Sequence, residues 1–552
     1  MASQIVVSDN KSQDSLPPKY PSKDADVAVD PVYASDSEEA DAKNPFRDPK
    51  VAAFYRDLYE NVQYECRHEF DPELEWTEKE ERKIVRKLDW HVTTWACIMF
   101  FALQVDRSNM SQAVSDNMLD QLGLTTNEYN YGHTIFLISF LLAELPSQLV
   151  SKKLGPDRWI PMQMVLWSIV AASQAALNGK SSFYATRALI GILEGGFIPD
   201  LVLWLSYFYT SSELPLRLSF FWTSLDITSI VTALMAYGLL QMNGIHGLAG
   251  WRWLFLIEGL ITLAVGVASF FLMPASAVAT KTWFRPNGWF NDREVGIVVN
   301  RVLRDDPSKG DMHNRMAITP SRLWRALCDY DLWPLYAIGL VVYQPFSPPN
   351  TYLTLSLRNL GFSTLNTNLL TIPSTAASIV TLIGLTWISE RVKERSFISM
   401  LQNVWALPCL LVLRFWAGTM ENQWGTYAVI SVLLSYPYCH AIVVAWASRN
   451  SGSVRTRSVS AACYNIFVQL GNVSSANIYR SNDAPVYHRG NSILIGLNIL
   501  AILLFPATKW YYTWRNKKRE ETWNAMTSEQ RKDYIENTKD QGNKRLDFRF
   551  AH

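Results

Sequence analysis

The stretch from Arg187 to Asp200 reads R-A-L-I-G-I-L-E-G-G-F-I-P-D and places two charges inside a segment otherwise apolar enough to cross a membrane. Arg187, Gly191 and Gly195 recur every four residues and Glu194 follows Arg187 by seven, so on a helix they share one face. A charge at the centre of a lipid-embedded helix costs roughly 2.5 to 3.5 kcal/mol, so this face should line a bundle interior or a watery cavity. The pair either holds helices together or serves function, and the pattern leaves both readings open.

The composition of the chain favours a membrane protein. Of 552 residues, 49% are apolar, 13% aromatic and only 18% charged, which is rich in apolar residues for a soluble protein. The charges gather in the first 87 residues, a middle segment and the last 38. The net charge of +1 gives no bulk attraction to nucleic acid, so no nucleic-acid partner is expected.

Twelve apolar tracts, each about 20 residues long, are predicted to span a lipid bilayer as helices. A hydrophilic stretch divides them into two groups of six. The sequence therefore predicts an all-α membrane protein with two six-helix halves. The tracts run over 89–112, 132–151, 159–177, 181–204, 216–242, 251–273, 330–356, 368–389, 396–418, 424–448, 456–479 and 491–514.

The predicted domains follow from these tracts: a tail over 1–87, a bundle over 88–273, a central loop over 274–329, a second bundle over 330–514 and a tail over 515–552. Residues 1–50 are too polar to bury much surface and are expected to be disordered. Thr77 and Glu80 form a capping-box pattern that predicts a helix start. A second helix is expected near Asp292 to Arg304. Lys and Arg are more frequent in the alternate loops that place both termini in the cytoplasm.

The first tract contains V-D-R-S-N-M-S, in which Arg107 and Asn109 are candidate ligands for a substrate. A guanidinium offers five donors in a planar fork that suits a carboxylate or sulfonate. Arg107 is equally well explained by snorkelling to the interface or by pairing with Asp106.

Further polar side chains in the later tracts are candidates for the same cavity. The run Y-Q-P-F-S-P-P-N interrupts the seventh helix, so Tyr343 and Gln344 lie at a break that is either a ligand site or a plain hinge. Amides on one face of the eleventh helix either line a pore or join helices. For Glu258 we expect a pair with Arg252. The remaining candidates are His440, Asn465 and Gln469 for substrate, and Asp226 together with Arg187 and Glu194 for proton coupling.

Several motifs of enzymes and motors are missing from the sequence. It contains no G-x-x-x-x-G-K-[ST] phosphate loop, no H-E-x-x-H zinc pair and no nucleophile elbow. We therefore expect no enzyme, no cofactor and no metal site.

The chain resembles the major facilitator superfamily in its two halves and in two degenerate loops, S-K-K-L-G-P-D-R-W and I-S-E-R-V-K-E-R. Within that superfamily it is similar to the fungal anion:cation symporters of the allantoate permease branch. Five segments carry this resemblance: V-D-R-S-N, E-L-P-S-Q, R-A-L-I-G-I-L-E-G-G-F-I-P, G-W-R-W-L-F-L-I-E-G and S-R-N-S-G-S-V-R-T-R.

The resemblance implies a monomeric, proton-coupled carrier of a small organic anion, in which two pseudo-symmetric halves rock around a central site. Arg107 would meet the anion, while Arg187 and Glu194 would form the proton-sensing pair. The branch carries allantoate, nicotinate, pantothenate, biotin, cysteine and sulfonates, and the chain looks nearest to the sulfonate and cysteine carriers. The plasma membrane is the expected location. The alternatives are a nutrient receptor with the same fold and, third, a membrane-embedded enzyme.

Overall fold

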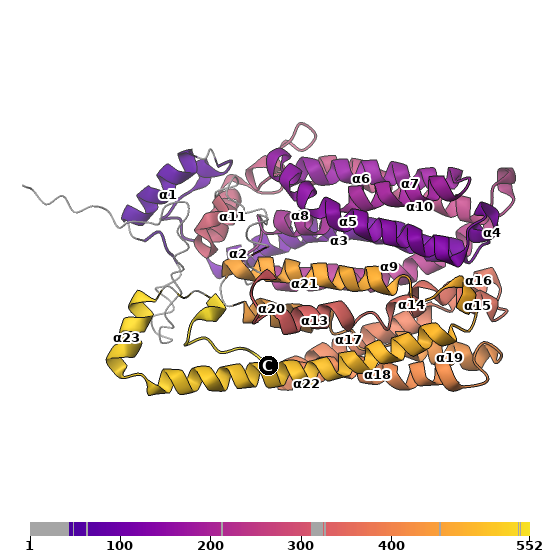
Figure 1. Cartoon of the computed structure of the whole chain (residues 1–552). Coiled ribbons are helices and arrows are strands. Elements are labelled where there is room, and N and C mark those ends of the chain that lie inside the picture. Colours follow the sequence, from indigo (N-terminus) through magenta and orange to yellow (C-terminus); the bar gives the residue numbers. More distant parts are fainter. Residues whose placement is uncertain are drawn as a thin grey trace, which may run out of the picture. The chain divides into compact units, whose positions relative to one another are not determined.

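A computed structural model describes residues 44–47, 49–61, 64–210, 213–310, 324, 327–392, 394–451, 454–538, 540 and 542–552. Most of the tail that we expect to be disordered lies outside these ranges. Its last residues enter helix α1 (Pro49–Asn61). The described residues form helices and no strands, which confirms the predicted all-α class (Figure 1).

The helices between residues 94 and 272 form the N-terminal lobe, in which α10 packs against α6 and α3, and α5 packs against α7. They coincide with the first six predicted tracts. The fourth tract differs, because it divides into two helices at Gly195 and Gly196 instead of forming one. The bounds are α3 (Thr94–Val114), α4 (Met118–Leu122), α5 (Thr126–Leu154), α6 (Pro156–Ser173), α7 (Lys180–Glu194), α8 (Phe197–Leu205), α9 (Leu214–Leu239) and α10 (Gly250–Leu272).

The helices between residues 333 and 525 form the C-terminal lobe, drawn in salmon to yellow in Figure 1. The prolines after Tyr343 interrupt the seventh tract as predicted, because proline cannot donate the helical hydrogen bond. The bounds are α13 (Trp333–Val341), α14 (Ser347–Thr351), α15 (Leu353–Asn359), α16 (Thr364–Leu369), α17 (Ile372–Val392), α18 (Ser396–Phe415), α19 (Gln423–Leu434), α20 (His440–Asn450), α21 (Val454–Ser475) and α22 (His488–Ala525).

Six stretches of helix among the described residues are long and apolar enough to cross a membrane, and they fall in both lobes. The remaining predicted tracts are also occupied by helices, some shorter or broken, so the arrangement is compatible with twelve spans. The longest helix, α22, continues well past the predicted end of its span at residue 514.

The two lobes share one hydrophobic core cluster, built from residues such as Met110 and Met118 of one lobe and Phe346 and Leu357 of the other. Hydrogen bonds reinforce this contact. Arg358 donates through Nη1 to the carbonyl of Ser115 at 2.9 Å, and Thr354 donates to the carbonyl of Ser111 at 2.6 Å. The amide of Asn130 donates to the carbonyl of Tyr479 at 2.6 Å. These bonds lie where α3 ends and α5 begins, at the end of the bundle opposite to the start of α3.

The segments outside the lobes contain the two short helices that the sequence predicts. Helix α2 (Glu78–Leu88) begins with the capping box of Thr77 and Glu80, and α11 (Asp292–Asp305) begins with a capping box of Asn291 and Glu294. Lys87 Nζ lies 2.6 and 2.8 Å from the two carboxylate oxygens of Glu294 and so joins these helices. Helix α2 leads into α3 through a short π-helix, Asp89–Thr93.

Candidate functional site

An ion pair between α3 and α7 forms the centre of the candidate site. Arg107 Nε donates to Glu194 Oε2 at 2.7 Å. The Glu194 side chain is fully buried, while that of Arg107 is 25% exposed. We expected Glu194 to pair with Arg187, and the structure gives it Arg107 as its hydrogen-bonded partner instead. The candidate substrate ligand and the candidate proton-coupling acid are therefore in direct contact.

Two phenylalanines of α5 lie beneath the arginines. The Arg107 guanidinium carbon is 5.0 Å from the ring centroid of Phe140 and 5.8 Å from that of Phe136. The Arg187 guanidinium carbon is 5.5 Å from the same Phe136 ring. Because a ring face attracts cations, Phe136 holds two like-charged groups near each other. Arg187 is buried and donates from Nη2 to Gln174 Oε1 at 3.2 Å.

The break in the fourth tract positions Glu194. Helix α7 ends at Glu194, and Gly196 takes φ of +86°, a conformation that glycine adopts without strain. The other two glycines of the motif let α5 come close, as predicted. A Cβ on Gly191 would lie 2.5 Å from the carbonyl oxygen of Phe136, and one on Gly195 would lie 2.8 Å from the Cβ of Ala143. Glu194 is thereby placed beside the phenylalanines of α5.

The other buried acids of this lobe do not join the ion pair. Asp106 accepts a hydrogen bond from Trp167 Nε1 at 3.0 Å, and the ion pair that Arg107 makes among the described residues is with Glu194. The expected pair of Glu258 with Arg252 is wrong, because Arg252 donates to the carbonyls of Ala175 and Leu177 at 2.5 and 2.9 Å. Glu258 is fully buried on α10, and it makes no ion pair among the described residues.

Asn109 lies two residues beyond Arg107 and is fully buried. Neither its amide oxygen nor its nitrogen makes a well-formed hydrogen bond among the described residues. Glu258 on α10 lies close enough to contact the amide. Asn109 and Glu258 thus form a buried polar pair between α3 and α10.

In the C-terminal lobe, the structure gathers Tyr343 and His440 into one aromatic cluster. The hydroxyl groups of Tyr343 and Tyr464 are 2.7 Å apart. The His440 ring stacks on Tyr438 with centroids 5.6 Å apart and lies 5.6 Å from Tyr343. Gln344 lies in the break after α13 and turns back toward that helix, because its Nε2 donates to the carbonyl of Leu340 at 2.7 Å.

The remaining candidates lie on α21 and α9. Asn465 is exposed, Gln469 is half-buried, and Gln469 Oε1 accepts from Asn472 at 3.3 Å. Helix α21 packs against α5, and Val473 contacts the cluster that contains Phe136. Gln469 lies one helical turn before Val473, so this face of α21 is near the Phe136 ring that both arginines approach. Asp226 is part of α9, and its side chain lies outside what the structure describes.

The sequence alone did not reveal Phe136, Phe140, Gln174 or Tyr464 as members of these clusters. Phe136 and Phe140 are four residues apart in an apolar helix, which is the normal pattern of core residues. In the structure, Phe136 and Phe140 differ from ordinary core residues because arginines of two neighbouring helices, α3 and α7, lie near their rings.

Residues 96–476 match the family model described as Major Facilitator Superfamily. A Saccharomyces cerevisiae protein named as an uncharacterized transporter is 43% identical over 530 residues, which cover 96% of this chain and 98% of that protein. The major facilitator-type transporter hxnP of Emericella nidulans is 28% identical over 457 residues, covering 80% of this chain and 88% of the relative.

Solved structures of transporters share the fold. A D-xylose-proton symporter superposes with a TM-score of 0.56 at 13% identity, over 76% of this chain and 97% of its own. An inward-facing, occupied bacterial homolog of the human lysosomal transporter Spinster gives 0.55 at 13% identity, over 76% and 96%. With its helical architecture and its match to the family model, the chain belongs to the major facilitator superfamily and is an integral membrane transporter.

Proposed function

We propose that the protein is a proton-coupled symporter of a small organic anion, of the carboxylate, sulfonate, amino-acid or vitamin type. The observation that carries this proposal is the 2.7 Å bond between a partly exposed arginine and a fully buried glutamate. A substrate anion can reach the Arg107 guanidinium, because this side chain is partly exposed. In the structure, the Glu194 carboxylate already binds that guanidinium. Arg187 adds a second guanidinium, 5.5 Å from the centroid of the same Phe136 ring.

This geometry makes the substrate and Glu194 competitors for one guanidinium. When Glu194 carries a proton, it loses its charge and with it most of its hold on Arg107. The freed guanidinium then binds the anion, and the loaded site carries one proton and one anion together. Proton binding and anion binding therefore favour each other, which is the thermodynamic requirement for symport.

The energetics support this stoichiometry. Moving one negative charge inward against an inside-negative potential costs about 2.3 kcal/mol per 100 mV. A co-transported proton cancels that cost because the pair crosses without net charge. A gradient of about two pH units then adds roughly 2.7 kcal/mol in favour of uptake.

The segments shared with the fungal anion:cation symporters support a place in the allantoate permease branch, with both termini cytoplasmic in the plasma membrane. We further propose that the protein works as a monomer, in which the two lobes move relative to each other and open the site to one side of the membrane at a time.

The test is accumulation of radiolabelled anions in vesicles reconstituted with the full-length protein. A simple alkyl sulfonate and nicotinate serve as substrates because each is a mono-anion at neutral pH, and each is tested with and without an acidic exterior. We expect an inward pH gradient to drive accumulation of at least one of them, and a potassium diffusion potential alone to leave it unchanged. Saturable binding without accumulation would instead identify a receptor.

A further inference from the structure

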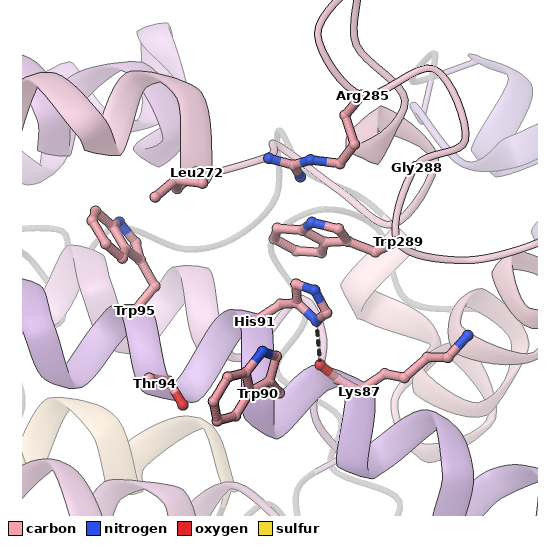
Figure 2. A pocket seen from close by; sticks show the side chains of 9 residues that line it. All are labelled: Lys87, Trp90, His91, Thr94, Trp95, Leu272, Arg285, Gly288 and Trp289. Carbon is pink, nitrogen blue, oxygen red and sulfur yellow. Dashed lines mark hydrogen bonds between the residues drawn. The ribbon is translucent and has the colours of Figure 1, made fainter.

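A pocket of about 460 Å³ opens beside the first turns of α3, at the end of the N-terminal lobe from which α2 enters. Its walls are the start of α3, the last residue of α10 and the loop 285–289 (Figure 2). The pocket lies on the opposite side of the lobe from the lobe-to-lobe hydrogen bonds. It has no residue in common with the Arg107 site.

The lining combines aromatic rings with basic groups. Figure 2 shows Arg285, Trp289 and His91 in a column, with Trp95 and Leu272 across the opening. The Arg285 guanidinium carbon is 4.9 Å from the Trp289 ring centroid, and the Trp289 and His91 rings are 4.8 Å apart. His91 Nδ1 donates to the carbonyl of Lys87 at 2.8 Å, so its other ring nitrogen is left for the pocket.

Arg285 supplies the uncompensated positive charge of this pocket. One of its donors binds the carbonyl of Phe271 at 3.2 Å, and among the described residues it makes no ion pair. Lys87 cannot play this role, because its ammonium is bound by Glu294. A guanidinium has five donors, so Arg285 retains several for phosphate oxygens.

The surroundings place this pocket at the bilayer interface. Phe270 and Phe271 are half exposed on the last turn of α10, a helix long and apolar enough to span. Trp90 is 73% exposed on the first turn leading into α3. Exposed tryptophans beside the end of a spanning helix are typical of the headgroup level. Helix α2 adds further basic residues immediately before this turn.

We propose that this pocket binds the phosphate headgroup of an anionic phospholipid. Arg285, held flat against Trp289, donates to the phosphate oxygens, while Trp90 and Phe271 contact the upper acyl chain. The site is separate from substrate transport, so the proposal stands or falls independently of the symport mechanism.

The test measures lipid retained by the full-length protein, by native mass spectrometry after extraction from nanodiscs of phosphatidylcholine mixed with phosphatidylglycerol. We expect wild type to retain phosphatidylglycerol in preference to phosphatidylcholine. Arg285→Gln should retain about fivefold less, the equivalent of roughly 1 kcal/mol for one basic side chain at the membrane surface. Arg414→Gln is the matched control, because Arg414 also lies over a ring, that of Phe415, but is not among the residues that line this pocket.

Trp90→Ala provides a second variant that leaves the buried core untouched and should also lower retention. Equal retention by wild type and Arg285→Gln, or an equal loss in Arg414→Gln, would overturn the proposal. So would displacement of the lipid signal by soluble glycerol phosphate or inorganic phosphate, because the pocket would then recognise a free phosphate and not a lipid.

Discussion

Arg107 and Glu194 lie on different helices and are joined by a 2.7 Å hydrogen bond, with the glutamate fully buried and the arginine partly exposed. This asymmetry gives the two residues different roles. In the symport mechanism that we propose, a ligand approaches Arg107 directly, whereas Glu194 responds to the ligand through the guanidinium they share. Anion binding and proton binding would then meet at this bond.

Replacing Glu194 with Gln should remove the acid stimulation of uptake. A neutral amide cannot take up or release a proton, so its contact with Arg107 no longer depends on pH. Uptake is measured over a range of external pH in reconstituted vesicles. Glu258→Gln is the matched control: Glu258 is equally buried in the same lobe but lies outside the ion pair. Acid stimulation that persists in Glu194→Gln, or that disappears equally in the control, would refute this role of Glu194.

Replacing Arg107 with Lys should raise the KM for the anion. Lysine keeps the charge but loses the planar fork and one charge-assisted hydrogen bond, which is worth about 1.5 to 3 kcal/mol, or roughly tenfold to hundredfold in affinity. Initial rates of uptake give the KM. Arg414→Lys, at a half-buried position of the C-terminal lobe bonded to Ser492, should leave the KM unchanged. An unaltered KM in Arg107→Lys contradicts direct contact with the anion.

Replacing Gly191 with Ala should destabilise the N-terminal lobe by about 1 to 3 kcal/mol, because its Cβ would overlap the backbone of α5. The midpoint of thermal unfolding is followed with a thiol-reactive dye, since Cys66 is buried against the N-terminal lobe and Cys97 is half-buried within it. Gly238→Ala is the control, because a Cβ there meets nothing within 4 Å. Equal midpoints in the two variants would show that close packing at Gly191 is not required.

Replacing Arg358 with Gln should loosen the lobe contact that it makes through the carbonyl of Ser115 and the side chain of Asn117. We expect the equilibrium between contacting and separated lobes to shift about fivefold toward separation at this end. This corresponds to a net loss of roughly 1 kcal/mol of hydrogen-bond free energy. Spin labels at the exposed positions Asp120 and Asn359 report the separation. Arg480→Gln is the control, since Arg480 bonds to Asn477 of its own lobe. Unchanged distance distributions in Arg358→Gln would show that the Arg358 hydrogen bonds do not hold the two lobes together.

Acidification should loosen α11 from α2. Burial by itself would raise the pKa of Glu294, but hydrogen bonds from Lys87 and the backbone of Asn291 outweigh it, and the pKa falls below its usual range. A lowered pKa means that the pair stabilises the fold above the ordinary glutamate value of about 4.3, and that this stabilisation is lost as pH falls through the lowered value.

Hydrogen–deuterium exchange of α11 amides checks this at each pH against Glu294→Gln. The intrinsic rate of amide exchange also depends on pH. Because this rate is the same in both proteins at a given pH, comparing wild type with the variant cancels it. The protection difference between the two proteins should disappear at low pH. A constant difference at every pH would show that the Lys87 pair does not hold α11.

The sequence predicts the features that depend on neighbouring residues. Apolar tracts of spanning length, the capping box at Thr77 and the proline break after Tyr343 all follow from local backbone chemistry, and the structure contains each of them. The predicted span over the fourth tract is present, but the sequence did not show that it divides into two helices. Gly196 takes a positive φ there, and nothing in an apolar run with glycines distinguishes a close helix contact from a helix end.

The sequence by itself determined the class of protein and the apolar helices long enough to cross a membrane, because hydrophobicity and helix periodicity are written along the chain. The tertiary structure alone decided which charges meet. Glu194 pairs with Arg107, 87 residues away, and both arginines share Phe136, because the packing of α3, α5 and α7 sets those distances and spacing along one helix does not.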